Sequence, residues 1–156
     1  ALYFLLSLLI LYLITTFGIF AVILNLRSGN GELTKISELN GLRFSSRSKS
    51  ISMLVFLFSL AGIPPFAGFF AKFFILSASI NEGLYILSVI AVVSSVIAAF
   101  YYLSVIKNMF FNDKDNDLLL DNNKIGSFVF ISSALILTLF FFYPDPLINL
   151  VDGLFS

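Results

Sequence analysis

The stretch that decides the fold is Ser59-Leu60-Ala61-Gly62-Ile63-Pro64-Pro65-Phe66-Ala67-Gly68-Phe69-Phe70-Ala71-Lys72. Between Lys49 and Glu82 the chain carries one charge, Lys72, and its surroundings are apolar. A lone ionisable group in such a segment costs about 2.5–3.5 kcal/mol at the centre of a membrane helix on insertion scales. Burial favours the neutral amine of a lysine, so such a group can exchange a proton. The stretch therefore predicts a broken membrane helix with a functional lysine.

The composition places the chain among membrane proteins. Of its 156 residues, 59% are hydrophobic and 12% are charged, whereas a soluble domain carries about 25% charged residues. The charges are clumped, which leaves uncharged runs long enough to cross a bilayer. The net charge is zero, and no basic stretch fits nucleic-acid binding. Because cysteine and histidine are absent, disulfides, Fe–S clusters, haem ligation by these residues and ordinary zinc sites are excluded within this chain.

Four apolar segments predict an all-α, polytopic membrane protein with a single membrane region over residues 1–156. The predicted spans cover residues 1–26, 51–80, 84–106 and 125–143, and the polar loops cover residues 27–50 and 107–124. The second span is too long for one straight helix, because its length would be about 45 Å. Each proline lacks an N–H group and clashes with the preceding turn, so this span is expected to be discontinuous at Gly62–Pro65.

Small and polar residues near the break are candidates for a hydrated path. Carbonyls that are freed at membrane depth must be buried in protein or line a wet cavity. Gly68, Lys72 and Ser79 share one helix face, and we expect Gly68 to leave room for water and Ser79 to offer a hydroxyl. Lys72 is the candidate for proton transfer. The residues expected to line the path or break the helix are Gly62, Pro64, Pro65, Gly68, Ser79, Ser95, Tyr102, Thr15 and Thr16.

Several of these residues also have a structural interpretation. The hydroxyls of Thr15 and Thr16 are expected to bond to carbonyls one turn back, although they can also border a hydrated path. Ala91, Ser95 and Ala99 form a seam of small residues that is typical of close helix packing. Both interpretations hold together if this seam packs against the broken helix.

For Lys72 the structural alternatives are an ion pair or a side chain that snorkels to the membrane surface. Lys72 lies ten residues before Glu82, which is about 15 Å of straight helix and long for snorkelling. No carboxylate occurs inside any predicted span. We therefore expect an electrostatic partner of Lys72 to lie in another chain or segment.

The loops set the expected orientation. Residues 27–50 carry five Lys or Arg residues and residues 107–124 carry three, whereas the Asn81–Gly83 turn and the C-terminal tail carry none. The positive-inside rule places the basic loops in the matrix or cytoplasm and the C-terminus on the opposite face. The stretch Asp113–Asp117 is similar to the start of a calcium loop, but Leu118 and Lys124 stand where glycine and glutamate are needed, so no metal site is expected.

Nearly the whole chain resembles one portion of a known family. The segments that carry the resemblance are Leu60–Phe69 followed by Lys72-Phe73, Ile97–Leu103, Lys107–Phe111, Phe17–Ala21 and Glu38–Leu42. They resemble the broken helix and its neighbours in subunit 2, the bacterial subunit N, of respiratory complex I, the proton-pumping NADH:ubiquinone oxidoreductase. The phenylalanine after Lys72 favours subunit 2 over the subunit 5 type.

The resemblance implies the C-terminal part of an antiporter-like inverted-repeat subunit, with Lys72 as the terminal proton-transfer residue. It implies that NADH, flavin, Fe–S clusters and ubiquinone are held by partner subunits, without redox chemistry or a cofactor in this chain. The expected partners are other membrane-arm subunits, the chain or segment that carries the N-terminal part of subunit 2, and lipids, without nucleic acid. Either the gene is split or the sequence is a piece.

Abundant Phe, Ile, Leu, Ser and Asn indicate codons rich in A and T. This favours the mitochondrial inner membrane, with the C-terminus in the intermembrane space and the bacterial inner membrane as the alternative. Two other functions stay open: a subunit of a cation/proton antiporter, and a structural membrane module that no longer pumps. Partner subunits with flavin and Fe–S clusters would favour complex I over the antiporter. Unchanged pumping in Lys72→Met would favour the structural module over a proton-transferring subunit.

Overall fold

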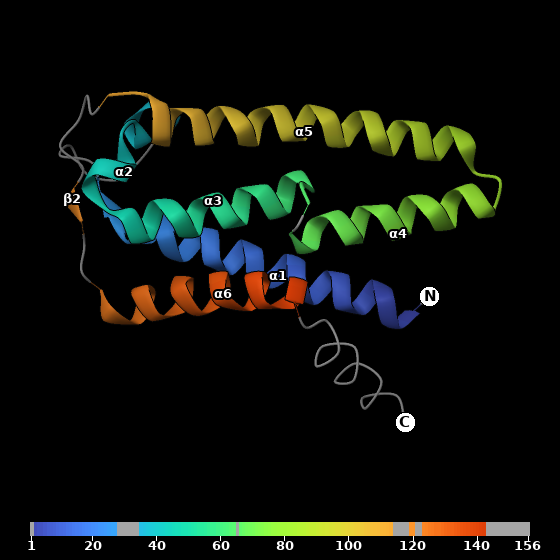
Figure 1. Ribbon diagram of the computed structural model, residues 1–156, viewed down its shortest axis with the longest axis horizontal. Coiled ribbons are helices and arrows are strands. Elements are labelled where there is room, and N and C mark those ends of the chain that lie inside the picture. Colours follow the sequence, from blue (N-terminus) through green and yellow to red (C-terminus); the bar gives the residue numbers. More distant parts are fainter. Residues whose placement is uncertain (1, 28–34, 65, 114–118, 121–122, 143–156) are drawn as a thin grey trace.

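The computed structural model describes residues 2–27, 35–64, 66–113, 119–120 and 123–142, and most of them are helical. The long helices run along one axis as an antiparallel bundle (Figure 1). They are α1 (Leu2–Leu24), α3 (Arg47–Ala61), α4 (Ala67–Asn81), α5 (Tyr85–Phe111) and α6 (Lys124–Phe142). In Figure 1, α5 lies on one side of α3 and α4, and α1 and α6 lie on the other. The expectation of a helical fold is confirmed.

Within the described residues, α5 is the helix that is long and apolar enough to cross a membrane by length and composition. Its 27 residues correspond to about 40 Å of helix, and few of them are buried. Shorter apolar helical stretches cover Leu9–Leu24, Gly68–Asn81 and Lys124–Phe140. The number of membrane spans therefore stays a prediction.

The segment between the two middle helices follows from local backbone chemistry. α3 begins after Ser46, whose hydroxyl accepts a hydrogen bond from the N–H of Lys49 at 3.4 Å. It therefore starts at Arg47, four residues before the predicted span. α3 ends at Ala61, and Gly62 follows with a left-handed φ of 78°, which glycine adopts without steric cost. α4 starts again after Phe66 and continues in the same general direction (Figure 1).

The hydrophobic core lies where α1, α3, α5 and α6 meet. Phe56 from α3 and Phe130 from α6 are its largest fully buried side chains. Gly18 lets α1 approach closely, because a Cβ at this position would lie 2.3 Å from the ring of Phe56. Burial of each such side chain contributes about 1.5–3 kcal/mol relative to exposure. The core therefore holds α1 against α3, the helix whose end leads to the break.

The two polar connections are tied together at one end of the bundle, opposite the Asn81–Gly83 turn (Figure 1). Strand β1 (Leu26–Arg27) pairs in antiparallel fashion with β2 (Leu119–Leu120). The sequence did not predict these strands, because each consists of two residues and depends on the other for its hydrogen bonds. Both basic loops thus start from the same end, as their predicted common side of the membrane requires.

The first connection also contains helical turns, η1 (Ile36–Leu39) and α2 (Leu42–Ser45), which pack beside α5. Asn112 from the end of α5 donates a hydrogen bond through Nδ2 to Oδ1 of Asn40 at 3.3 Å. The description of residues 27–50 as a polar loop is therefore too simple, since Leu42 is fully buried. α5 likewise continues five residues beyond the predicted end at residue 106, because its last turns bury Met109.

Candidate functional site

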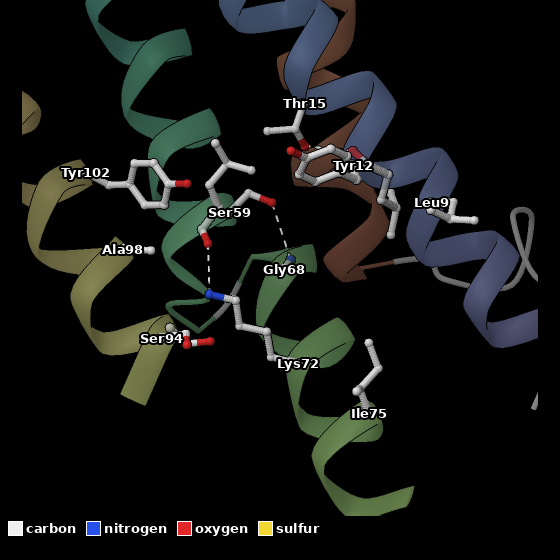
Figure 2. A pocket seen from close by; sticks show the side chains of 13 residues that line it. Leu9, Tyr12, Thr15, Ser59, Gly68, Lys72, Ile75, Ser94, Ala98 and Tyr102 are labelled. Atoms are coloured by element: carbon white, nitrogen blue, oxygen red, sulfur yellow. Dashed lines mark hydrogen bonds between the residues drawn. The ribbon is translucent and has the colours of Figure 1, made fainter. Parts of the chain in front are cut away.

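Lys72 extends from α4 back to the C-terminal end of α3. Its Nζ donates hydrogen bonds to the carbonyl oxygens of Leu60 at 3.0 Å and Ala61 at 3.1 Å. Figure 2 shows the partly buried side chain reaching across the break from one helix to the other. Lys72 therefore has hydrogen-bond partners within this chain, the main-chain carbonyls at the end of α3. From the sequence, we expected an electrostatic partner in another chain or segment.

The turn at the end of α3 explains why these carbonyls are available. The last carbonyls of an α-helix have no partner within the helix. The N–H of Ile63 donates to the carbonyl of Phe58 at 3.1 Å. The N–H of Gly62 donates to the carbonyl of Ser59 at 3.1 Å. This is the Schellman pattern, and the next two carbonyls in the chain are those that Lys72 binds.

The end of α3 is also electrostatically suited to a cation. The aligned peptide dipoles of a helix place partial negative charge at its C-terminus. A cation at such an end gains typically 0.3–1 kcal/mol, and up to about 2 kcal/mol where the contact is partly buried. The ammonium of Lys72 occupies this position through the two carbonyls. The contact offsets part of the cost of placing a charge among apolar side chains.

Gly68 holds the start of α4 against the end of α3. Its N–H donates to Oγ of Ser59 at 3.3 Å (Figure 2). A Cβ at Gly68 would lie 1.7 Å from the carbonyl oxygen of Ser59. The space that a side chain at Gly68 would occupy is therefore filled by the backbone of α3 and not left for water, although Gly68 itself borders a cavity beside Lys72. Gly62 lies against the side chain of Lys72, since a Cβ added at Gly62 would be 2.8 Å from Cδ of Lys72.

Lys72 borders two cavities, of about 600 Å³ and about 250 Å³. The larger one lies between α1, α3, α4 and α5, and Figure 2 shows labelled side chains from all four helices around it. It is lined by Leu9, Leu11, Tyr12, Thr15, Ser59, Leu60, Gly68, Lys72, Ile75, Ser94, Ser95, Ala98 and Tyr102. The smaller cavity is lined by Ala61, Gly62, Phe69, Lys72, Phe73, Leu76, Val92, Ser95, Val96 and Ala99.

Lys72 and Ser95 line both cavities. Among the described residues that line them, Lys72 is the one charged side chain. Tyr102 and Thr15, which the sequence also indicated, line the larger cavity. Two residues of the small-residue seam on α5, Ser95 and Ala99, therefore face the smaller cavity beside the helix break, whereas Ala91 is not among the described residues that line either cavity.

The structural interpretation of the two threonines is confirmed. Thr15 donates to the carbonyl of Leu11 at 2.7 Å, and Thr16 donates to that of Tyr12 at 2.9 Å. Thr15 lines the larger cavity as well, but Thr16 is not among the described residues that line either cavity. The two interpretations thus coexist at Thr15 alone.

Ser79 and Pro64 are not among the described residues that line the two cavities. The hydroxyl of Ser79 bonds to the hydroxyl of Ser88 and donates to the carbonyl of Leu76 at 3.1 Å. It therefore connects α4 to α5 instead of facing Lys72. Pro64 is exposed in the break, and Pro65 lies outside the described residues.

The sequence did not single out Ser59 or Ser94 as site residues. Ser59 could have been recognised from the sequence, because it stands three residues before Gly62. A helix that ends at a glycine uses the carbonyl of the residue at this position in its closing turn. Within the described part of the chain, no group of three or more acidic, histidine or cysteine residues lies close enough together to hold a metal ion. The site is thus one cation, two main-chain carbonyls and several hydroxyls between apolar walls.

This arrangement of a broken helix and a lysine at its free carbonyls lies in a segment with clear relatives. Residues 2–98 match the family described as NADH:quinone oxidoreductase/Mrp antiporter, transmembrane. The matched residues contain α1, α3, the break, α4 and half of α5. The chain belongs to this family.

Within the family, the chain is similar to proteins named NADH-quinone oxidoreductase subunit N. It is 40% identical to that of Rhodospirillum rubrum over 139 residues, which cover 89% of this chain and 28% of the relative. It is 40% identical to that of Pelagibacter ubique over 144 residues, which cover 91% of this chain and 30% of the relative. The chain thus spans less than a third of the length of these relatives.

A solved structure shows the same fold. One chain of respiratory complex I from Thermus thermophilus, determined with bound Aureothin, superimposes with a TM-score of 0.73. The match covers 94% of this chain and 36% of that chain, at 21% sequence identity. The bundle and its connections are therefore an arrangement found in an experimentally determined complex.

Proposed function

We propose that the chain translocates protons as part of the membrane arm of an NADH:quinone oxidoreductase, with Lys72 transferring protons in the membrane. The observation that carries this proposal is the position of Lys72 at both cavities, with its Nζ on the carbonyls of α3. A titratable amine at the boundary of two spaces has what a proton carrier needs, namely a charge that can be neutralised and acceptors on each side. The family and the subunit N relatives support the same function.

In this proposal, water in the larger cavity exchanges protons with Nζ of Lys72. Hydroxyls of Ser59, Tyr102 and Ser95 offer hydrogen-bond partners for that water. The helix break belongs to a discontinuous membrane span, one of four, and such breaks expose backbone groups near the midplane of transporters. The basic connections face the matrix or cytoplasm, so protons leave towards the opposite side.

We place the redox chemistry in partner subunits. NADH, flavin, Fe–S clusters and ubiquinone are held there, and this chain contributes the proton path alone. Its neighbours are other membrane-arm subunits, together with the segment that corresponds to the N-terminal part of subunit N, and lipids. The location is a mitochondrial inner membrane, which the composition favours, or a bacterial inner membrane, which the bacterial relatives favour.

A cation/proton antiporter is the second candidate, because the family description names the Mrp antiporter beside the oxidoreductase. The two functions use the same helices and differ in their partners. Purification of the complex from its native membrane separates them. Flavin and Fe–S absorbance in stoichiometric amounts supports the oxidoreductase, and sodium-dependent proton exchange without these cofactors supports the antiporter.

The experiment that tests proton transfer is the substitution Lys72→Met in the complete protein, with Lys107→Met as the matched control. Methionine keeps similar volume and removes the proton site, whereas Lys107 is exposed near the end of α5. Proton uptake into proteoliposomes is measured per assembled complex. We expect Lys72→Met to lose pumping and Lys107→Met to retain it. Unchanged pumping after Lys72→Met would contradict the proposal and support the structural module.

A further inference from the structure

The end of α3 offers Lys72 two hydrogen-bond acceptors. Two carbonyls, those of Leu60 and Ala61, accept from Nζ at 3.0 and 3.1 Å. A lysine ammonium carries three N–H donors. Its neutral amine carries two N–H donors and one lone pair. Both forms can therefore keep the two carbonyl bonds while only the third position on the nitrogen changes.

We infer that the left-handed turn at Gly62 positions Lys72 for proton transfer, because it leaves two carbonyls that hold the amine in the same place in both protonation states. This inference rests on the proposed role of Lys72 in moving protons. In the transfer step, the third N–H bond breaks and its electron pair stays on nitrogen. The proton passes to a water oxygen in a cavity, and the return step reverses these changes. The side chain stays on the carbonyls throughout.

The left-handed conformation of Gly62 is what makes the turn possible. With φ at 78°, it closes the Schellman pattern that uses the carbonyls of Phe58 and Ser59 and spares the next two. A side chain here is disfavoured twice, by this φ and by a Cβ that would lie 2.8 Å from Cδ of Lys72. Gly62→Ala is therefore expected to shift Nζ relative to its acceptors.

Gly83 provides a matched control for the backbone strain. It also has a left-handed φ, 76°, in the turn between α4 and α5. A Cβ at Gly83 would have nothing within 4 Å. Gly83→Ala thus imposes a similar conformational cost without touching Lys72. A difference between the two variants reports on the position of the amine.

The test measures proton pumping and its pH profile in proteoliposomes for the complete complex with Gly62→Ala, Gly83→Ala or Lys72→Met. We expect Gly62→Ala to lower pumping per complex by roughly 10- to 100-fold, since small misplacements of reacting groups cost about this much. We also expect a changed pH midpoint, whereas Gly83→Ala keeps both values. Equal behaviour of the two alanine variants, with pumping lost in Lys72→Met, overturns the positioning role alone. Retained pumping in Lys72→Met overturns the proposed function itself.

A second pair of variants decides the question if Gly62→Ala does not assemble. Ser59→Ala removes the acceptor for the N–H of Gly68, which holds α4 against the end of α3. Ser52→Ala is its control, because Ser52 is a buried serine of the same helix that lies outside both cavities. A changed pH midpoint in Ser59→Ala but not in Ser52→Ala supports positioning. Identical pH profiles overturn it.

Discussion

In the described part of the chain, Lys49 and Lys72 each bind main-chain carbonyls at the end of a helix, in very different surroundings. Nζ of Lys49 donates at 2.7 Å to the carbonyl of Asn25, the residue that follows α1. Nζ of Lys72 donates to the last carbonyls of α3. Lys49 is 5% exposed and is not among the described residues that line either cavity, whereas Lys72 lines both.

Lys49 and Lys72 share a hydrogen bond to a main-chain carbonyl, and they differ in whether a cavity lies beside the amine. An ammonium on a carbonyl at a helix end is favourable in both places, because the end of a helix carries partial negative charge. At Lys49 the contact joins α1 to α3 beside the β1–β2 pair. At Lys72 the same kind of contact leaves the amine beside open space. In our proposal, access to a cavity is what distinguishes Lys72 as a proton carrier from Lys49 as an anchor.

The largest expected effect contrasts these lysines in pumping. We expect Lys72→Met to reduce proton pumping by at least about 100-fold, the lower end of the contribution of a positioned acid–base group. Lys49→Met should keep the pumping rate per assembled complex, since its amine faces neither cavity. Dye-monitored acidification of proteoliposomes measures both variants. Comparable losses in the two would break the distinction between carrier and anchor.

The next effect concerns the junction that places Lys72. Gly68→Ala puts a Cβ at 1.7 Å from the carbonyl oxygen of Ser59, and overpacking against backbone should destabilise the protein by about 1–3 kcal/mol. Thermal unfolding in detergent, followed by circular dichroism, measures the loss. Ala78→Gly, at an exposed position of the same helix, is the control and should cost about 1 kcal/mol or less. A stable Gly68→Ala variant would show that α3 and α4 do not touch there.

Lys49 should contribute to stability, whereas an exposed lysine should not. Lys49→Met leaves the carbonyl of Asn25 without this donor in a buried site, and we expect a loss of about 1–3 kcal/mol in unfolding free energy. Lys107→Met, at an exposed position, should stay within about 0.5 kcal/mol of the parent. Denaturant titration in detergent compares the two. If Lys49→Met were as stable as the parent, the hydrogen bond from Lys49 to Asn25 would not anchor α1 to α3.

The smallest expected effect lies at the same end of the bundle as Lys49. Nδ2 of Asn112 donates to Oδ1 of Asn40 at 3.3 Å and of Asn108 at 3.1 Å. Because these bonds are only partly buried, Asn112→Ala should cost about 0.5–1.5 kcal/mol. Asn81→Ala, at an exposed position at the end of α4, serves as the control. The same titration would contradict the expectation if the asparagine variant lost more than Lys49→Met.

The helices and Lys72 could be predicted from sequence because their signals are local. Uncharged runs mark the helices, glycine and proline mark the break, and a lone charge stands out in an apolar stretch. The acceptors of Lys72 could not be recognised in the same way, because they are main-chain atoms that every residue possesses. Only the closing turn of α3 at Gly62 selects which carbonyls are free.

Other features could not be predicted from the sequence, because they depend on contacts between segments that are far apart in the chain. Lys49 was assigned to a polar loop, and only the approach of Asn25 shows that it is buried. Ser79 shares a helix face with Lys72, but its hydroxyl meets Ser88 of the next helix. Gly68 was read as space for water, and the carbonyl of Ser59 fills that space. Side-chain periodicity shows which face a residue occupies and not what lies opposite.

Chemical rescue at position 72 tests most directly whether an amine there carries the protons. The chain contains no cysteine, so Lys72→Cys introduces the single thiol of this chain, and 2-bromoethylamine converts that thiol into an amine of nearly lysine length. The protons pumped per NADH oxidised are measured before and after this treatment, with the parent complex treated in parallel. We predict a low ratio in the variant and its recovery after alkylation. An unchanged ratio in Lys72→Cys, or no recovery when mass spectrometry shows the alkylated residue, would contradict proton transfer by Lys72.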